Sequence, residues 1–115
     1  MDIQLKRGML DVCVLAAIRQ ADSYGYQIIK DLKPYVDISE STLYPVLRRL
    51  QKVNYLRTYD APYQGRNRRY YAITDEGRNM LEFYENEWNE YKDKIDGLIK
   101  GTGLVPSEGV MEEKD

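Results

Sequence analysis

The sequence has no histidine and only one cysteine among its 115 residues, and these shortages exclude several kinds of functional site. Histidine is the commonest general base and the commonest zinc ligand, and Cys13 alone can form neither an internal disulfide nor a zinc site of the usual kind. The chain also lacks the glycine-rich phosphate-binding motifs of nucleotide enzymes and the G-x-S-x-G motif of hydrolases. We therefore predict that the protein is not an enzyme and that it carries no metal and no cofactor.

Long hydrophobic runs are missing as well. The longest apolar stretch covers residues 12–18 and is too short to span a bilayer. The N-terminus does not combine a basic region, an unbroken apolar run and a small-residue cleavage site, so we expect no signal peptide. A single cysteine fits a reducing compartment. We predict a cytoplasmic protein that does not associate with membranes.

Positive charge is in slight deficit, with 17 basic against 19 acidic residues, but the two signs are unevenly distributed. Residues 1–74 contain 12 basic and 7 acidic side chains, whereas residues 75–115 contain 5 and 12. Such asymmetry is typical of proteins whose basic part binds nucleic acid. Charge that varies along a surface without functional consequence would produce the same counts, so charge alone leaves both readings open.

The first third of the chain has the apolar content of two helices. Residues 5–20 are hydrophobic almost all round, which predicts a helix covered on more than one side, for which a second copy of the protein would serve. A second helix follows an N-cap at Asp22 or Ser23 and runs to Pro34. Gly25 falls in its first turn, where we expect close packing against another element.

A third helix is predicted in the segment "SESTLYPVLRRLQKVN". Pro45 is tolerated only near a helix start, which favours Ser41 over Ser39 as the N-cap, and Asn54 suits a left-handed C-cap. The buried stripe at helical spacing consists of Leu43, Val46, Leu47, Leu50 and Val53. The opposite, polar face carries Ser41, Tyr44, Pro45, Arg48 and Lys52, with Arg49 at its edge.

Two strands and a long helix complete the pattern. Residues 55–61 and 68–74 alternate and are rich in tyrosine, which predicts a β-hairpin with the turn residues Pro62, Gly65 and Asn67 between them. In the second strand Tyr70 and Tyr71 point to opposite faces, so one is expected in the core and the other on the surface.

The last helix has its N-cap at Thr74 and a repeating apolar pattern. Apolar residues recur at spacings of three and four, as in helices that pack along one another. We call this set the C-terminal seam: Leu81, Tyr84, Trp88, Tyr91, Ile95 and Leu98. The sequence therefore predicts a DNA-binding domain over residues 1–74, a dimerisation helix over 75–100 and a flexible acidic tail over 101–115.

The order of three helices, a hairpin and a long helix predicts a mainly α fold with a small β-hairpin, namely a winged helix-turn-helix followed by a dimerisation helix. In that fold the third helix enters a major groove of DNA and the hairpin reaches the backbone or a minor groove. Between Arg48 and Tyr70 there are seven basic residues and one acid, Asp60. A stripe of this kind matches DNA phosphates, and its binding should weaken steeply with salt.

Three motifs in this order, "YGYQI", "STLYPVLRRLQKVNYL" and "GRNRRYYAITDEGR", resemble the hallmarks of the PadR family of bacterial transcriptional regulators. The single C-terminal helix resembles the small subfamily that includes the lactococcal multidrug-binding regulator. The resemblance implies a homodimer held together by the C-terminal and first helices. It also implies repression at inverted-repeat operators in double-stranded DNA. Asn54 stands where the family often has glycine, and asparagine also tolerates a left-handed conformation.

The resemblance also assigns roles to residues. The groove-facing positions of the recognition helix are Ser41, Thr42, Tyr44, Pro45 and Arg48, with Arg49 and Lys52 as phosphate contacts. The wing consists of Gln64, Gly65, Arg66, Arg68 and Arg69, of which Arg66 and Arg68 are expected to reach phosphates or a narrow minor groove. Two alternatives stay open: Tyr44 packs on the hairpin, and Arg49 pairs with an acid of the first helices.

The dimer interface implied by the family adds Leu10 and Leu15 of the first helix to the C-terminal seam. Trp88 matches a tryptophan that flanks flat aromatic ligands in the multidrug-binding relative. Tyr84 and Tyr91 lie about one turn away, so all three are candidate effector-binding residues. The alternative is that Trp88 only packs the dimer core. Two other functions remain: a winged-helix adaptor whose basic face binds an acidic protein, and a small-molecule-binding protein acting through Trp88.

Overall fold

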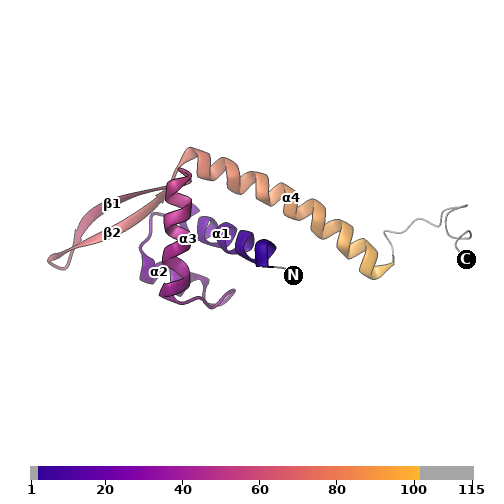
Figure 1. Ribbon diagram of the computed structural model, residues 1–115, viewed down its shortest axis with the longest axis horizontal. Helices are drawn as coiled ribbons and strands as arrows, with labels where there is room; N and C mark the ends of the chain where they lie inside the picture. Colours follow the sequence, from indigo (N-terminus) through magenta and orange to yellow (C-terminus); the bar gives the residue numbers. More distant parts are fainter. Residues whose placement is uncertain (1–2, 102–115) are drawn as a thin grey trace, which may run out of the picture. The chain divides into compact units, whose positions relative to one another are not determined.

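The computed structural model describes residues 3–101 (Figure 1). Side chains are described from residue 8 onward. The elements follow the predicted order of three helices, a hairpin and a long helix. They are α1 (Ile3–Arg19), α2 (Gly25–Leu32), α3 (Glu40–Lys52), β1 (Leu56–Tyr63), β2 (Arg66–Ile73) and α4 (Asp75–Lys100). The predicted fold class, mainly α with a β-hairpin and a long C-terminal helix, is confirmed. Most of the predicted acidic tail, residues 102–115, lies outside the described residues.

The described chain divides after Phe83 into two compact units. The first, which we call the winged unit, includes the start of α4 because Gly77 and Leu81 are buried there. The second begins at Tyr84 and contains the rest of α4. The predicted boundary at residue 75 marks the start of α4, whereas the winged unit continues to Phe83.

The core of the winged unit is built from the apolar faces of α1, α2 and α3 and the inner ends of the two strands. Leu15 is only 1% exposed and Leu81 only 4%, so both are already buried within one chain. The prediction that they line a dimer interface is corrected accordingly, because almost none of their surface is left for a second chain. Leu10 is partly buried against the same core.

The N-caps of α2 and α3 differ from the predicted ones. Tyr24 precedes α2 without a side-chain cap, because Ser23 pairs through its backbone with Tyr71 instead. The cap of α3 is Ser39, whose hydroxyl accepts a hydrogen bond from the Thr42 N–H at 3.3 Å. Pro45 consequently lies inside the helix, on the exposed face where water can solvate the carbonyl that its missing N–H leaves free.

The C-terminal end of α3 follows the prediction in part. Asn54 has the left-handed backbone expected of a C-cap, with φ of 65°. Val53 was expected in the buried stripe but is 51% exposed, because it stands at the helix end where the chain turns away. The other four stripe residues are buried as predicted: Leu43, Val46, Leu47 and Leu50.

The hairpin is longer and its turn tighter than predicted. Gln64 and Gly65 both have positive φ, 52° and 79°, which is the backbone of a two-residue type I′ turn. The ladder therefore continues to the pair Tyr63–Arg66, and Pro62 and Asn67 oppose one another as strand residues. Among residues 3–101 no helix combines the length and apolar character needed to cross a membrane.

Candidate nucleic-acid interface

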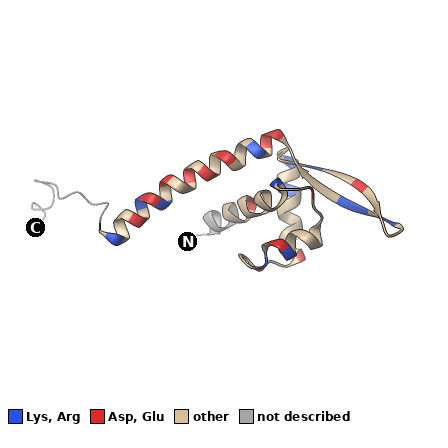
Figure 2. Cartoon of the chain, turned by 180° about the vertical axis from the view of Figure 1, so that it is seen from behind, with Lys and Arg blue, Asp and Glu red and all other residues tan. Residues whose placement is uncertain are grey.

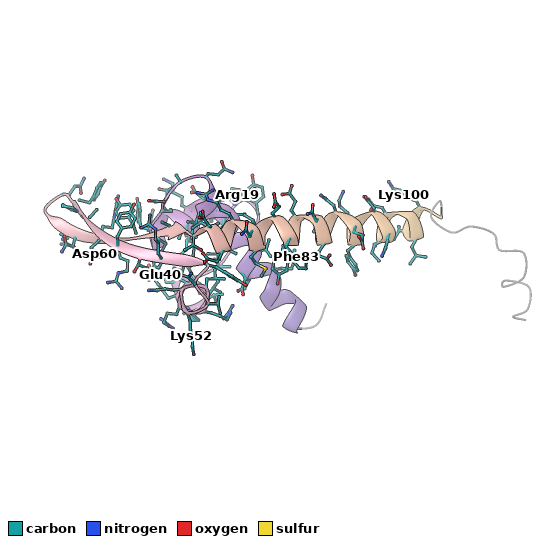
Figure 3. All side chains as sticks on the ribbon, turned by 90° about the horizontal axis from the view of Figure 1, so that it is seen from above. Arg19, Glu40, Lys52, Asp60, Phe83 and Lys100 are labelled. Carbon is teal, nitrogen blue, oxygen red and sulfur yellow. The ribbon has the colours of Figure 1, made fainter. Side chains whose placement is uncertain are left out.

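α3 separates a buried from an exposed face. We call the exposed set the recognition face: Ser41, Thr42, Tyr44, Pro45, Arg48 and Lys52. Figure 3 views the helix nearly along its axis, and the labelled Lys52 side chain points outward. The leucines and Val46 on the other face anchor the helix to the core, so the recognition face is presented on a rigid element.

Tyr44 packs against the start of α2. A Cβ atom at Gly25 would overlap the Tyr44 hydroxyl and lie 3.0 Å from Cζ, so the expected close packing at Gly25 is confirmed. The ring stands at the edge of a surface cavity of about 480 Å³ between α2, α3 and β2. Its lining includes Tyr26, Tyr44, Asn67, Arg69 and Tyr71. The cavity thus lies between the recognition face of α3 and strand β2 of the hairpin.

Gly25→Ala is expected to reduce DNA affinity several-fold while changing the unfolding temperature by only a few degrees. The added methyl displaces the flexible end of Tyr44, which can swing toward solvent at small cost, but the recognition face then loses its shape. Titration of duplex DNA and thermal denaturation of the same variant check both parts. A large loss of stability with unchanged DNA affinity would contradict the assignment of Tyr44.

The hairpin tip is exposed and basic. Gln64, Gly65 and Arg66 are all exposed, and Asn67 follows them on β2. Arg69 lies opposite Asp60 in the ladder, and its Nε is 3.3 Å from the Asp60 carboxylate. At this exposed site the ion pair contributes little, so Arg69 remains able to exchange its partner for a phosphate.

Arg49 pairs with an acidic residue of the first helix, as the alternative prediction stated, and is not left free for the predicted phosphate contact. Its Nη2 forms a salt bridge with the carboxylate of Asp11 on α1, and its Nε lies 3.4 Å from the same carboxylate. Both side chains are partly buried, so the pair joins α3 to α1 inside the winged unit. Within the part of the chain that the structure describes, Arg48, Lys52 and Arg66 take part in no such ion pair.

Arg68 also departs from its predicted place at the wing tip. Its guanidinium lies against the rings of Tyr24 and Tyr63, with Cζ 3.6 Å and 3.7 Å from the ring centroids. A side chain held between aromatic rings cannot extend toward a phosphate at the same time. The prediction that Arg68 reaches DNA is therefore corrected, whereas Arg66 remains exposed at the turn.

Two tyrosines near the site have raised pKa values. The hydrogen bond that Tyr59 donates to Asp22, at 2.6 Å, raises the pKa of its phenol. Burial raises the pKa of Tyr71, which is the inward member of the pair Tyr70 and Tyr71, as the alternation predicted. Both phenols stay neutral near pH 7, so neither adds negative charge to the surface.

The charges are segregated between the elements. Lysine and arginine recur along the hairpin, whereas acidic residues recur along α4 (Figure 2). A polyanion such as DNA is therefore attracted to the hairpin and repelled by α4. This places the electrostatically favoured binding surface on the winged unit.

The part of α4 beyond Phe83 carries exposed apolar residues at helical spacing. Trp88 is 47% exposed, and Tyr84, Tyr91 and Leu98 are exposed as well, while Ile95 is half-buried. The Trp88 and Tyr91 rings lie 6.3 Å apart between centroids. A row of large apolar side chains on one helix face is typical of a helix that packs along another helix.

Residues 14–83 match the family described as transcriptional regulator PadR-like. The chain belongs to this family. Its members are transcriptional regulators, not enzymes. The matched region runs from α1 into α4 and so covers the recognition face and the hairpin.

Solved structures support the same family. The present chain is 42% identical to smu.1704 from Streptococcus mutans UA159. The match covers 85% of the present chain and 91% of smu.1704, with a TM-score of 0.75. The chain is 31% identical to a PadR-like transcriptional regulator of Bacillus cereus, with coverage of 84% and 96% and a TM-score of 0.76. Bacillus subtilis PadR, solved in complex with operator DNA, is 21% identical with a TM-score of 0.62. The chain covers 45% of that protein, a likeness that shows the fold alone.

Tyr24 and Tyr63, the partners of Arg68, are what reasoning from the sequence missed in this PadR-like chain, whereas Asp11 is the acid of the first helices that it offered to Arg49 without naming the residue. The alternation of the hairpin contains a signal for one of them, because Ala61 and Tyr63 share a face with Arg68 and Tyr70 once the register is known. The register depends on the two-residue turn at Gln64 and Gly65, whereas the sequence predicted a longer turn between residues 61 and 68. Tyr24 and Asp11 come from distant segments and carry no local signal.

Proposed function

We propose that the chain is a homodimeric repressor that binds an inverted-repeat operator in double-stranded DNA. The observation that carries this proposal is the surface formed by the recognition face and the basic wing tip on one compact unit. Family membership supports it, and so does the operator complex of Bacillus subtilis PadR. Selection of bound duplexes from random DNA tests it directly, with a palindromic consensus as the expected result.

Each part of the surface has a role in the proposed complex. The recognition face enters the major groove, where Arg48 can pair with a guanine edge and Tyr44 contacts the groove wall. Ser41 and Thr42 lie at the start of α3, where backbone N–H groups favour phosphate. Lys52 contacts the phosphate backbone, and Gln64, Gly65 and Arg66 reach it from the wing tip.

Arg48→Ala is expected to weaken binding of the selected duplex by about 1–3 kcal/mol and to relax specificity at one base pair. The exposed guanidinium supplies a bidentate contact that alanine cannot make. A competition titration with duplexes substituted at each position measures both effects. Lys100→Ala, an exposed position in the last turn of α4, removes a charge outside the winged unit and serves as the control. Equal affinity of Arg48→Ala and the wild type would refute the assignment.

Dimerisation follows in this proposal from the C-terminal seam beyond Phe83. The exposed residues of that row would bury their apolar area against the same row of a second chain, and Leu10 of α1 offers a further partly buried contact. A two-fold dimer presents two recognition helices about one DNA turn apart, which matches an inverted repeat. The acidic residues of α4 keep this helix away from the phosphate backbone.

The proposal also includes a small-molecule effector that binds at Trp88. Trp88, with Tyr84 and Tyr91 one turn away, offers aromatic surface for a planar small molecule, and the acidic residues of α4 favour a cationic one. Trp88 is the only tryptophan, so its fluorescence reports on this place alone. We expect planar aromatic cations to quench it and to release the bound duplex. Unchanged emission across a broad panel of such compounds would leave Trp88 with a packing role only.

A further inference from the structure

The guanidinium of Arg68 is enclosed by aromatic rings from three segments of the winged unit. We call Tyr24, Tyr63 and Tyr70 the tyrosine cage. The Arg68 Cζ atom lies 3.6 Å from the Tyr24 centroid, 3.7 Å from that of Tyr63 and 5.1 Å from that of Tyr70. The Nε–H also donates a hydrogen bond to the Tyr70 hydroxyl at 3.0 Å. The charged group is therefore fixed in both position and orientation.

The sheet register explains why these groups meet. Tyr63, Arg68 and Tyr70 share one face of the hairpin, and Ala61 opposite Arg68 leaves room for the stacked rings. The backbone pair between Ser23 and Tyr71 places the segment before α2 along the free edge of β2. Because neighbouring residues alternate between faces, Tyr24 then lies on the same face as Arg68.

A second set of contacts strengthens the same connection. Tyr59 stacks on Tyr70 with centroids 5.4 Å apart and planes 9° from parallel. Tyr59 also donates its hydroxyl hydrogen bond to Asp22, two residues before Tyr24. The tyrosine side chains of the hairpin are thus attached at two points to the segment that leads into α2.

These contacts matter because the outer half of the hairpin has little other support. Gln64, Gly65, Arg66 and Asn67 are exposed, and a two-stranded ribbon without a packed face is only marginally ordered in water. Arg68 and Tyr70 of β2 both contact Tyr24, the residue that precedes α2, and Arg68 is the one nearer the tip. Loss of the cage would leave the tip free to move relative to α3.

We infer that Arg68 is a positioning residue for DNA binding. Through its contacts with the tyrosine cage it holds the wing tip at a fixed position relative to the recognition face. This rests on the proposed function of the winged unit. In this role Arg68 donates no contact to DNA. Its effect passes through Arg66: the ordered tip presents this guanidinium to the phosphate backbone, whereas a mobile tip makes the same contact only after it has been ordered, at a cost in affinity.

Charge and geometry can be separated by five variants. Arg68→Ala removes both the charge and the stacking, whereas Arg68→Lys keeps the charge and loses the planar group. Tyr63→Leu removes one wall of the cage, and Tyr63→Phe keeps the ring as its matched control. Arg66→Ala removes a charge at the tip without touching the cage. Thermal denaturation of each variant establishes that the winged unit is folded.

Two measurements give the expected results. In the free protein, backbone ¹⁵N relaxation at Gly65 and Arg66 should show a more mobile tip in Arg68→Ala, Arg68→Lys and Tyr63→Leu, and a wild-type tip in Tyr63→Phe. On the selected duplex, the three disruptive variants should bind about tenfold more weakly, within the range of a cation–π contact. Their slope of log affinity against log salt should stay at the wild-type value. Arg66→Ala should lower that slope by about 0.9, the value of one phosphate contact.

The opposite pattern would overturn the inference. If Arg68→Ala lowered the salt slope as Arg66→Ala does, while Tyr63→Leu bound normally and the tip stayed ordered, Arg68 would be a phosphate contact. If the wild-type protein selected no duplex, the proposed function would fail instead. The relaxation comparison would still decide whether the cage orders the wing.

Discussion

A chain carrying Tyr91→Asp and Ile95→Asp is expected to sediment as a monomer and to bind the selected palindrome at least about 100-fold more weakly. The two residues lie in the middle of the C-terminal seam, and Tyr91 is exposed in the single chain. Carboxylates there would be buried unpaired in a dimer, which costs far more than the lost apolar contact. Each winged unit would then bind a half-site alone. Sedimentation velocity and a titration of the palindrome measure the two effects.

The matched control places the same charges on the other side of the helix. Asn86→Asp and Asn89→Asp are both exposed and lie off the seam, so the dimer and its DNA affinity should persist. Thermal denaturation should show the winged unit folded in both double variants, because these positions lie beyond Phe83. A dimer that survives the seam substitutions would show that α4 does not hold the two chains together.

Gly77→Ala is expected to lower the free energy of unfolding by about 3 kcal/mol, at the upper end of the cost of overpacking. A Cβ atom at Gly77 would overlap the Tyr55 carbonyl oxygen and lie 2.8 Å from Cγ1 of Ile73. The carbonyl cannot retreat freely, because it accepts the Thr74 N–H at 3.1 Å. The Gly77 N–H is itself bound to the Thr74 hydroxyl at 2.9 Å, which confirms the predicted cap of α4. Urea denaturation measures the loss.

Gly8→Ala supplies the same chemical change in open space. Apart from the chain neighbours and the backbone of α1, no atom of the described residues lies within 4 Å of a Cβ built at Gly8, so alanine there should stabilise α1 by up to about 1 kcal/mol. The two substitutions are thus expected to have opposite signs. Equal effects on the urea midpoint would mean that helix propensity, rather than contact with Tyr55, decides the outcome at Gly77.

The recognition helix, α3, shows which features a sequence pattern predicts and which it does not. Its buried stripe and polar face follow from spacing alone, because a helix repeats every 3.6 residues whatever surrounds it. Its start was placed two residues late. Pro45 favours Ser41 as the cap in sequence, yet the cap is Ser39, whose extended backbone at φ −92° brings its hydroxyl to the Thr42 N–H.

The arginines show where such patterns fail. Arg48, Arg49, Arg66 and Arg68 looked alike as members of one basic stripe, yet they meet different surroundings. Arg48 and Arg66 are exposed, Arg49 pairs with Asp11, and Arg68 is enclosed by tyrosine rings. A guanidinium binds any suitable carboxylate or ring within reach. Which one is within reach depends on residues distant in the chain.

The sequence by itself determined the order of the elements, the amphipathic faces of the helices, the hairpin and the family, because these depend on local periodicity, turn chemistry and short motifs. The tertiary structure alone decided which basic residues stay exposed and which are held by other side chains, and that Leu15 and Leu81 belong to the core. It also decided that the wing is attached to the segment before α2. The physical reason is that ion pairs, ring stacking and burial are made between segments far apart in sequence, and their partners are fixed only when the chain packs.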